Sequence, residues 1–301
     1  MRLLTRSDFD GICCAVLLKE IGLMDEMVYA HPKDLQDGKV PVDKNDILAN
    51  VPYVDGCGLW FDHHSSEHER LELAGKYEGC SKSAMSAARV ISDYYGEEKF
   101  TRFKDMLEYV DRVDAGMLTE YEILSPTGWV LLGFICDPRT GLGYHKNYRI
   151  SNLAFMNDLV DHIRTKTIDE ILNLPDTKER IERYKANDQQ ARDFIDRHSR
   201  LDGSVLITDA RDAEDLPPSN RFLIYSLYPE SNISIRMIDG RGKEFVAISV
   251  GYSILNRTAT VDVGSLMLKY GGGGHRKVGT CQVPYDKADT VLKELIEACK
   301  A

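Results

Sequence analysis

Short apolar runs alternate with helix-like segments through the first hundred residues, and this alternation constrains the fold more than any other feature of the chain. Four runs have the length and composition of buried strands: residues 3–5, 27–30, 46–51 and 59–61. Residues 12–21 read as an apolar helix, and Ser81 is placed to cap a helix over residues 84–91. Strands that alternate with helices form a parallel sheet. We therefore predict an N-terminal α/β domain with its site at the carboxyl ends of the strands.

Two polar clusters stand where strands of this sheet are expected to end. Asp62, His63 and His64 follow the run at 59–61, and Asp8 and Asp10 lie between the first strand and the first helix. Carboxylates and neutral imidazoles are ligands that suit Mn²⁺ or Mg²⁺. The seven cysteines form no Cys-x-x-Cys pair, which argues against structural zinc and against a disulfide framework. The clusters therefore predict a site for a hard divalent cation.

The second half of the chain changes character twice. Residues 155–198 are helical and charged, and a break at Gly203 precedes strand-like runs, a short helix over residues 263–270 and the glycine run 271–274. We predict two domains, residues 1–200 with the helical connector and residues 201–301. Consecutive glycines can surround a phosphate with backbone N–H groups, although a glycine run is also typical of a plain surface loop.

Charge and hydropathy limit the partners. The formal net charge of −10 argues against broad binding of duplex DNA, which needs a basic surface. A small anionic substrate remains compatible with it if bound cations and local arginines reverse the field at the site. No apolar run approaches the roughly 18 residues that span a bilayer, and no cleavable signal precedes the first aspartates. We expect a cytoplasmic protein without a membrane partner.

The order of these motifs resembles the DHH phosphoesterase superfamily with its DHH-associated C-terminal domain, in the exopolyphosphatase-related and oligoribonuclease-like group. The resemblance rests on Asp8-x-Asp10-Gly11, on Asp62-His63-His64, on an aspartate within residues 109–116, and on the glycine run closed by His275. It implies metal-dependent hydrolysis of small phosphoesters in a cleft between the two domains. The implied substrates are short single-stranded oligonucleotides, nucleotide bisphosphates or dinucleotides, and a homodimer is left open.

The resemblance also implies roles for single residues. Asp8, Asp10 and His63 are expected to bind the metal directly. Asp62 is expected to bind the metal or to support a ligand, and His64 to support a ligand or contact phosphate. Two aspartates compete for the remaining position, Asp111 and Asp114. We favour Asp114, because two small residues follow it.

Substrate contacts are expected mainly in the second domain. The resemblance assigns them to Arg257, Gly272, Gly273, Gly274 and His275. A turn-rich segment over residues 136–143 carries Arg139, which either contacts substrate or belongs to an ordinary loop.

Two residues depart from the family pattern. Arg6 stands where a metal ligand is usual, and Asn50 stands where a bridging aspartate is usual. A guanidinium cannot bind a cation, so we predict one tightly bound ion, Mn²⁺ or Mg²⁺. Arg6 either replaces the positive charge of a second ion or pairs with Asp8 or Asp10. The substitutions keep an alternative open, a catalytically weakened nucleotide-binding or regulatory protein. An inorganic pyrophosphatase is a third possibility, although the glycine-rich segment is not expected there.

Overall fold

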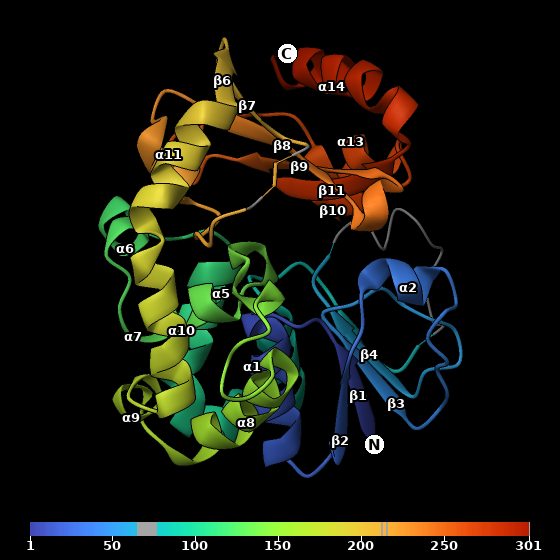
Figure 1. The fold of residues 1–301 in the computed structure, drawn as a ribbon. Helices are drawn as coiled ribbons and strands as arrows, with labels where there is room; N and C mark the ends of the chain where they lie inside the picture. Colours follow the sequence, from blue (N-terminus) through green and yellow to red (C-terminus); the bar gives the residue numbers. More distant parts are fainter. Residues whose placement is uncertain (65–76, 212, 215, 301) are drawn as a thin grey trace. The chain divides into compact units, whose positions relative to one another are not determined.

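The computed structural model describes residues 1–64, 77–211, 213–214 and 216–300 (Figure 1). These residues form two compact units, each of which is described by itself. The first contains Met1–His64, residues 77–118 and Ser125–Lys185. The second contains Thr119–Leu124 and residues 186–300. The chain therefore divides between Lys185 and Ala186, and the separate roles assigned to residues 1–200 and 201–301 stay a prediction.

The first unit is built on a parallel sheet. Among the described residues the strand order is β2-β1-β3-β4-β5, and every neighbouring pair is parallel. The strands are β1 (Arg2–Thr5), β2 (Glu26–Tyr29), β3 (Asp46–Ala49), β4 (Leu59–Asp62) and β5 (Gly79–Ser81). Leu3, Leu4, Ile47 and Leu48 are fully buried, because helices and loops cover both faces of the central strands. The predicted parallel α/β domain is confirmed.

Helices of the first unit gather around α1 (Phe9–Glu20), which packs against α4, α5, α7 and α8. Its residues from Phe9 to Leu18 are all buried, as expected for a helix with apolar side chains on every face. The other helices are α2 (Pro32–Gln36), α4 (Ala87–Tyr95), α5 (Lys104–Asp114), α7 (Gly128–Cys136), α8 (Asn152–Thr165), α9 (Ile168–Leu172) and α10 (Pro175–Ala186), with the 3-10 turns η1 (Glu97–Phe103), η2 (Pro138–Thr140) and η3 (Leu142–Tyr144).

One predicted helix cap is wrong. Ser81 does not begin a helix, because it lies in β5 and pairs with Asp62 of β4. Helix α4 begins later, and Ser86 is its cap, with a hydroxyl that accepts a hydrogen bond from the backbone N–H of Arg89. Both serines precede the same alanine-rich run, and the strand pairing of Ser81 decides between them.

The second unit is a mixed sheet with the order β10-β11-β9-β8-β7-β6 among the described residues. Its strands are β6 (Ser199–Asp202), β7 (Val205–Ala210), β8 (Ile233–Asp239), β9 (Val246–Tyr252), β10 (Gly273–His275) and β11 (Val278–Val283). Its helices are α6 (Glu120–Leu124), α11 (Asp188–His198), α12 (Leu223–Leu227), α13 (Val263–Leu268) and α14 (Tyr285–Lys300), with the 3-10 turn η4 (Arg241–Lys243). Inward residues of β7, β8, β9 and β11 form one core with α13 and α14. The predicted smaller α/β domain with a glycine-rich segment is confirmed.

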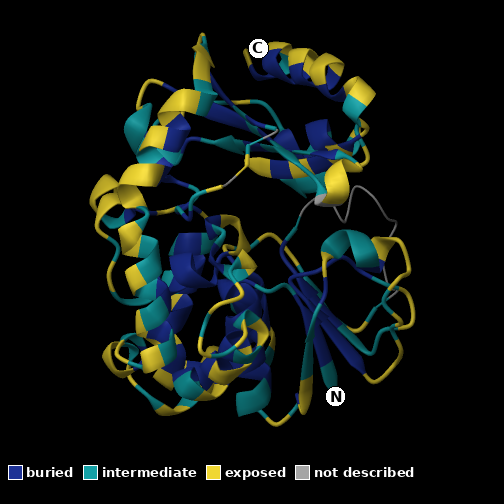
Figure 2. Cartoon of the chain, in the orientation of Figure 1, coloured by how far each residue is buried: buried dark blue, intermediate teal, exposed yellow. Residues whose placement is uncertain are grey.

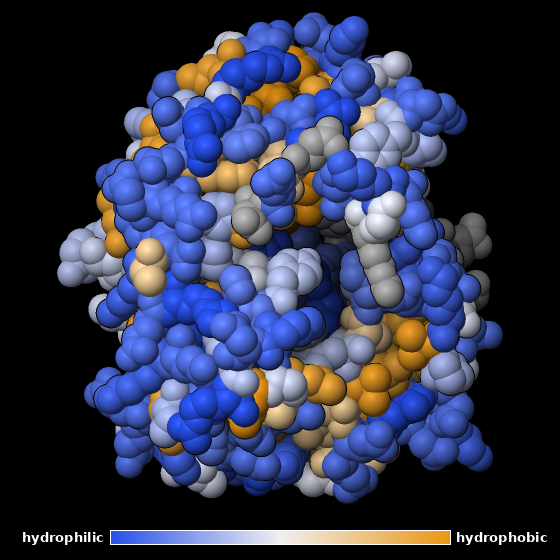
Figure 3. Space-filling model, viewed as in Figure 1, coloured by the Kyte–Doolittle hydropathy of each residue, from blue (hydrophilic) through white to orange (hydrophobic). Residues whose placement is uncertain are grey.

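Burial follows the same logic in both units. Figure 2 shows the central strands of each sheet as buried, while most exposed positions lie on helix surfaces and loops. The face drawn in Figure 3 is mostly hydrophilic, in keeping with the 29% of charged residues. None of the helices in the described ranges is both long and apolar enough to cross a membrane. All seven cysteines lie in those ranges and are free thiols.

Candidate active site

Asp10 is held at the point where two helices begin. It lies in the first turn of α1, and its carboxylate accepts hydrogen bonds from the backbone N–H groups of Ala87 at 2.8 Å and Ala88 at 2.9 Å, the first residues of α4. These bonds fix both oxygens at the positive end of a helix. Burial, followed by the charge of Asp114, nevertheless raises the pKa of Asp10 to about 7.

His63 follows β4 directly and turns one ring nitrogen toward carboxylates. Nδ1 lies 3.2 Å from the carbonyl oxygen of Ala84, which can only accept, so this nitrogen carries the proton. Nε2 therefore presents its lone pair, 3.7 Å from Asp10 Oδ2 and 3.4 Å from Asp114 Oδ2. Burial opposes protonation of His63, but Asp114 and Asp10 outweigh it and raise the pKa.

These three groups have the chemistry of a metal centre. One ligand atom each from Asp10, His63 and Asp114 lies within 4.8 Å of the other two. Two carboxylates and an imidazole lone pair that face one another repel unless a proton or a cation lies between them. The hydrogen bond from Nδ1 to a backbone carbonyl is the support that metal-binding histidines usually have. The first unit thus contains a possible metal-binding group whose donors fit a divalent cation.

Asp8 makes other contacts. It caps α1 by accepting the backbone N–H of Gly11 at 2.9 Å, and the same oxygen, Oδ1, accepts Nδ2 of Asn50 at 3.0 Å. Its second oxygen lies 3.2 Å from Nε of Arg6. Asn50 reaches this position from a left-handed backbone conformation, φ 58°, directly after β3. The two residues that depart from the family pattern therefore both contact Asp8, and the direct metal-binding role predicted for Asp8 stays a prediction.

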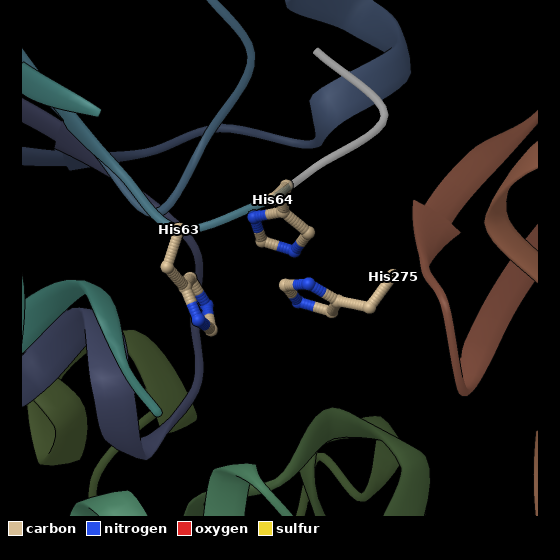
Figure 4. Close-up of side chains that lie close together, drawn as sticks. All are labelled: His63, His64 and His275. Carbon is tan, nitrogen blue, oxygen red and sulfur yellow. The ribbon is translucent and has the colours of Figure 1, made fainter. Parts of the chain in front are cut away.

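Asp62 and His64 form a pair next to the metal-binding group. Asp62 Oδ1 lies 2.8 Å from Nδ1 of His64, and Oδ2 accepts the backbone N–H of His64 at 3.3 Å. Burial lowers the pKa of His64 well below its ordinary value, and His63 and Arg6 add to this effect. Asp62 therefore orients a neutral imidazole. Figure 4 shows the rings of His63 and His64 side by side on the segment that follows β4.

The two aspartates near the end of α5 have different surroundings. Asp111 is buried, accepts the hydroxyl of Ser86 at 2.6 Å, and pairs with Arg89 at 2.9 Å through Nε and 2.7 Å through Nη2. Asp114, one turn later, faces His63. The geometry favours Asp114 as the ligand. The roles of Ser86 and Arg89 could not be predicted from the sequence, because only the fold brings α4 beside α5.

Arg139 belongs to the first unit, and the carboxylate of Asp137, two residues earlier, holds its side chain in place. Asp137 accepts its backbone N–H at 2.9 Å, its Nε at 2.7 Å and its Nη2 at 2.9 Å. Burial opposes protonation of Arg139, but Asp137, Asp8 and Asp114 together raise its pKa. Asp137 was not singled out from the sequence, although an aspartate two residues before an arginine is a pattern that can be recognised.

The substrate residues predicted from the glycine run lie in the second unit. His275 ends β10, which pairs with β11, and Arg257 donates its Nε to the carbonyl of Ile254 at 2.8 Å. A Cβ on Gly272 would collide with the carbonyl oxygen of Thr280, so packing alone requires a glycine at that position. His275 is also labelled in Figure 4. Substrate contacts by Arg257, the glycines and His275 stay predictions.

Comparison with known proteins identifies the family to which the chain belongs. No family model matches the chain, and no curated protein matches it. Among solved structures, the pGpG-specific phosphodiesterase PggH from Vibrio cholerae is 44% identical, with a TM-score of 0.76 over 99% of this chain and 98% of that one. The chain is a member of the DHH phosphoesterase superfamily. The DHH domain of a member of the s1p family of ribosomal proteins has the same fold, with 12% identity and a TM-score of 0.59 over 98% of this chain and 85% of that one.

Membership of the DHH phosphoesterase superfamily identifies the class of reaction that the protein catalyses. As a DHH phosphoesterase it is a hydrolase, and Asp62-His63-His64 is its eponymous motif. In this chain the middle residue of the motif, His63, belongs to the metal-binding group, while Asp62 and His64 are hydrogen-bonded to each other.

Proposed function

We propose that this DHH phosphoesterase is a metal-dependent phosphodiesterase that cleaves short linear dinucleotides such as pGpG into mononucleotides. The observation that carries the proposal is the likeness to PggH over almost the full length of both chains. The group formed by Asp10, His63 and Asp114 supports it, because hydrolysis of a phosphodiester near neutral pH needs charge neutralisation at phosphorus.

The roles of the residues follow from their contacts. Asp10, His63 and Asp114 would hold one divalent cation, which supplies Lewis acidity that lowers the pKa of water and stabilises charge on a phosphoryl group. The N-terminus of α4 holds Asp10 in place, and the carbonyl of Ala84 holds the ring of His63. His64, kept neutral by burial and oriented by Asp62, can exchange a proton with substrate or water.

We infer a single tightly bound ion, Mn²⁺ or Mg²⁺. The carboxylate of Asp8 already accepts hydrogen bonds from Gly11 and Asn50 and pairs with Arg6. A second cation bound to Asp8 would have to displace the guanidinium of Arg6 from this carboxylate. Arginine stays protonated, so that displacement has an electrostatic cost.

The test combines turnover with binding. Purified protein with added Mn²⁺ should convert pGpG to mononucleotide, and EDTA should abolish the reaction. Asp10→Asn should reduce kcat by at least about 100-fold while KM changes much less, because the carboxylate acts on charge at the reacting centre. Glu294→Gln, an exposed carboxylate on α14, is the matched control and should retain wild-type rates.

The weakened binding protein is the second candidate, and Arg6 and Asn50 are the observations that favour it. If the protein binds pGpG but does not hydrolyse it with Mn²⁺, Mg²⁺ or Co²⁺, the result would favour a nucleotide-binding protein over an active enzyme.

Substrate recognition by the second unit is also part of the proposal. His275→Ala and Arg257→Ala are expected to raise KM for pGpG more than they lower kcat, since both residues are assigned to the part of the substrate away from the scissile phosphate. A homodimer and a cytoplasmic location stay predictions from the sequence.

A further inference from the structure

Two arginines of the first unit share an unusual arrangement. Each is anchored on one edge by a carboxylate from its own segment, and each remains partly open to solvent. Nε of Arg6 lies 3.2 Å from Asp8, and its side chain is 29% exposed. Arg139 contacts Asp137 through Nε and Nη2, and its side chain is 38% exposed. An anchored guanidinium loses little conformational entropy when a ligand binds to its free edge.

The open edges are defined by the atoms already in use. The ion pair of Arg6 uses Nε and leaves its two terminal nitrogens outside that contact. Within the part of the chain that the structure describes, the hydrogen bonds of Arg139 use Nε and Nη2 and leave Nη1 available. Three guanidinium nitrogens can therefore donate to a ligand without breaking either anchor.

Both arginines belong beside the metal-binding group. Arg6 immediately precedes the segment that carries Asp8 and Asp10. Arg139 follows α7, and α7 packs tightly between α1 and α5, since a Cβ on Gly133 would lie 3.2 Å from Phe9 and 3.2 Å from Val113. The charges of Asp8 and Asp114 also contribute to the raised pKa of Arg139.

Cations placed around a cluster of acids stabilise the folded protein, but the anchors show that each arginine already has its own carboxylate. The remaining donors suit an anion with several oxygens. A phosphoryl group fits, because guanidinium donors match its oxygen spacing and charge. A phosphoryl group bound at the metal-binding group would keep other oxygens for guanidinium donors, and the charges of Asp8 and Asp114 act on Arg139.

We propose that Arg6 and Arg139 form a clamp for the scissile phosphate, with Asp8 and Asp137 as the residues that position it. This inference rests on the proposed phosphodiesterase function and deepens it. The clamp stabilises the charge on the non-bridging oxygens in the transition state, so it acts on every phosphodiester substrate and does not depend on a terminal phosphate.

The second unit supplies a matched control. Arg211 contacts Asp209, also two residues earlier, through its backbone N–H at 3.2 Å, Nε at 2.9 Å and Nη2 at 2.6 Å. The local geometry copies that of Arg139, but Arg211 also pairs with Asp289. Arg211→Met therefore removes an equivalent ion pair outside the proposed clamp.

The experiment measures phosphate binding and turnover separately. Binding of inorganic phosphate is measured by calorimetry in EDTA, where no metal contributes. Arg6→Met and Arg139→Met should each weaken it about tenfold or more, and Arg211→Met should leave it unchanged. Arg139→Lys keeps a charge and serves if Arg139→Met does not fold. Unchanged phosphate binding in folded variants of both clamp residues would overturn the clamp, whether or not pGpG is a substrate.

Turnover with Mn²⁺ then identifies the phosphate. The clamp variants should lose kcat by similar factors on pGpG and on GpG, which lacks the terminal phosphate. A loss confined to pGpG and expressed mainly in KM would assign the arginines to the terminal phosphate and refute the proposal as stated. If wild-type protein hydrolyses neither compound but the clamp variants still lose phosphate affinity, the proposed function fails and the anion site stands.

Discussion

Two single variants of α5, Asp111→Asn and Asp114→Asn, should have different effects. We expect the first to lower the stability of the fold and the second to lower the affinity for metal. Asp111 is buried, accepts a hydrogen bond from the hydroxyl of Ser86, and pairs with two guanidinium nitrogens of Arg89. Asp111→Asn removes the nearest charge partner of the guanidinium, which then keeps its longer contact with the exposed Glu97 at 3.6 Å. Hydrogen bonds to charged groups contribute about 1.5–3 kcal/mol each, and disruption of a buried pair costs about 3–5 kcal/mol. Because Arg89 is partly exposed, we expect a loss of about 2–4 kcal/mol in the unfolding free energy.

Asp114→Asn should behave in the opposite way. Its side chain is 24% exposed and faces Nε2 of His63, so removal of its charge relieves repulsion with Asp10 in the metal-free protein. We expect an unfolding free energy within about 1 kcal/mol of wild type. The affinity for Mn²⁺ should fall at least about tenfold, because loss of a direct ligand exceeds the smallest effects seen for supporting residues.

Two measurements on the same protein samples test this exchange. Urea unfolding in EDTA, followed by circular dichroism, gives the stability of each variant, and calorimetric titration with Mn²⁺ gives the affinity. Reversed results, with Asp111→Asn defective in metal binding and Asp114→Asn unstable, would refute the assignment of the two residues.

Three shorter predictions concern other parts of the chain. Burial opposes the ion pair of Asp46, but the hydrogen bonds from Arg2 and from the backbone of residue 43 lower the pKa of Asp46 below 3.8. The pair therefore contributes stability above about pH 4 that is lost as the pH falls through the lowered pKa, and Asp46→Asn should flatten this acid limb in urea titrations from pH 6 to 2. Gly272→Ala should destabilise the second unit by about 1–3 kcal/mol through its collision with Thr280, and normal stability would contradict the packing at β10. Arg6→His should raise the Mn²⁺ stoichiometry in elemental analysis, and an unchanged value would exclude Arg6 as the group that prevents a second ion.

The strands and the first helix were predictable because their signal is local. Leu3, Leu4, Ile47 and Leu48 are apolar in short runs, and α1 is apolar on every face, so burial follows from composition. The start of α4 was not predictable, because Ser81 and Ser86 are equally good caps and strand pairing decides. The inclusion of residues 119–124 in the second unit depends on contacts distant in sequence, such as the hydrogen bond from Asn220 to the carbonyl of Ile123.

The members of the candidate metal-binding group could be proposed from the sequence, and their role as ligands stays a prediction. The motifs indicate Asp10, His63 and Asp114 as candidates, and the fold brings these three side chains together. The partners of Asp8 could not be read from the sequence, since Asn50 reaches it only through a left-handed backbone conformation after β3. The anchor of Arg139 was missed for a different reason. Its pattern is local, but the same pattern at Arg211 shows that it does not by itself identify a site.

Anomalous diffraction from crystals grown with Mn²⁺ would locate the bound ions and identify their ligands. We predict one strong peak in the first unit, coordinated by Asp10, His63 and Asp114, with Arg6 still paired to Asp8. A pair of strong peaks with Asp8 as a shared ligand, or a single peak that none of the three residues contacts, would contradict it.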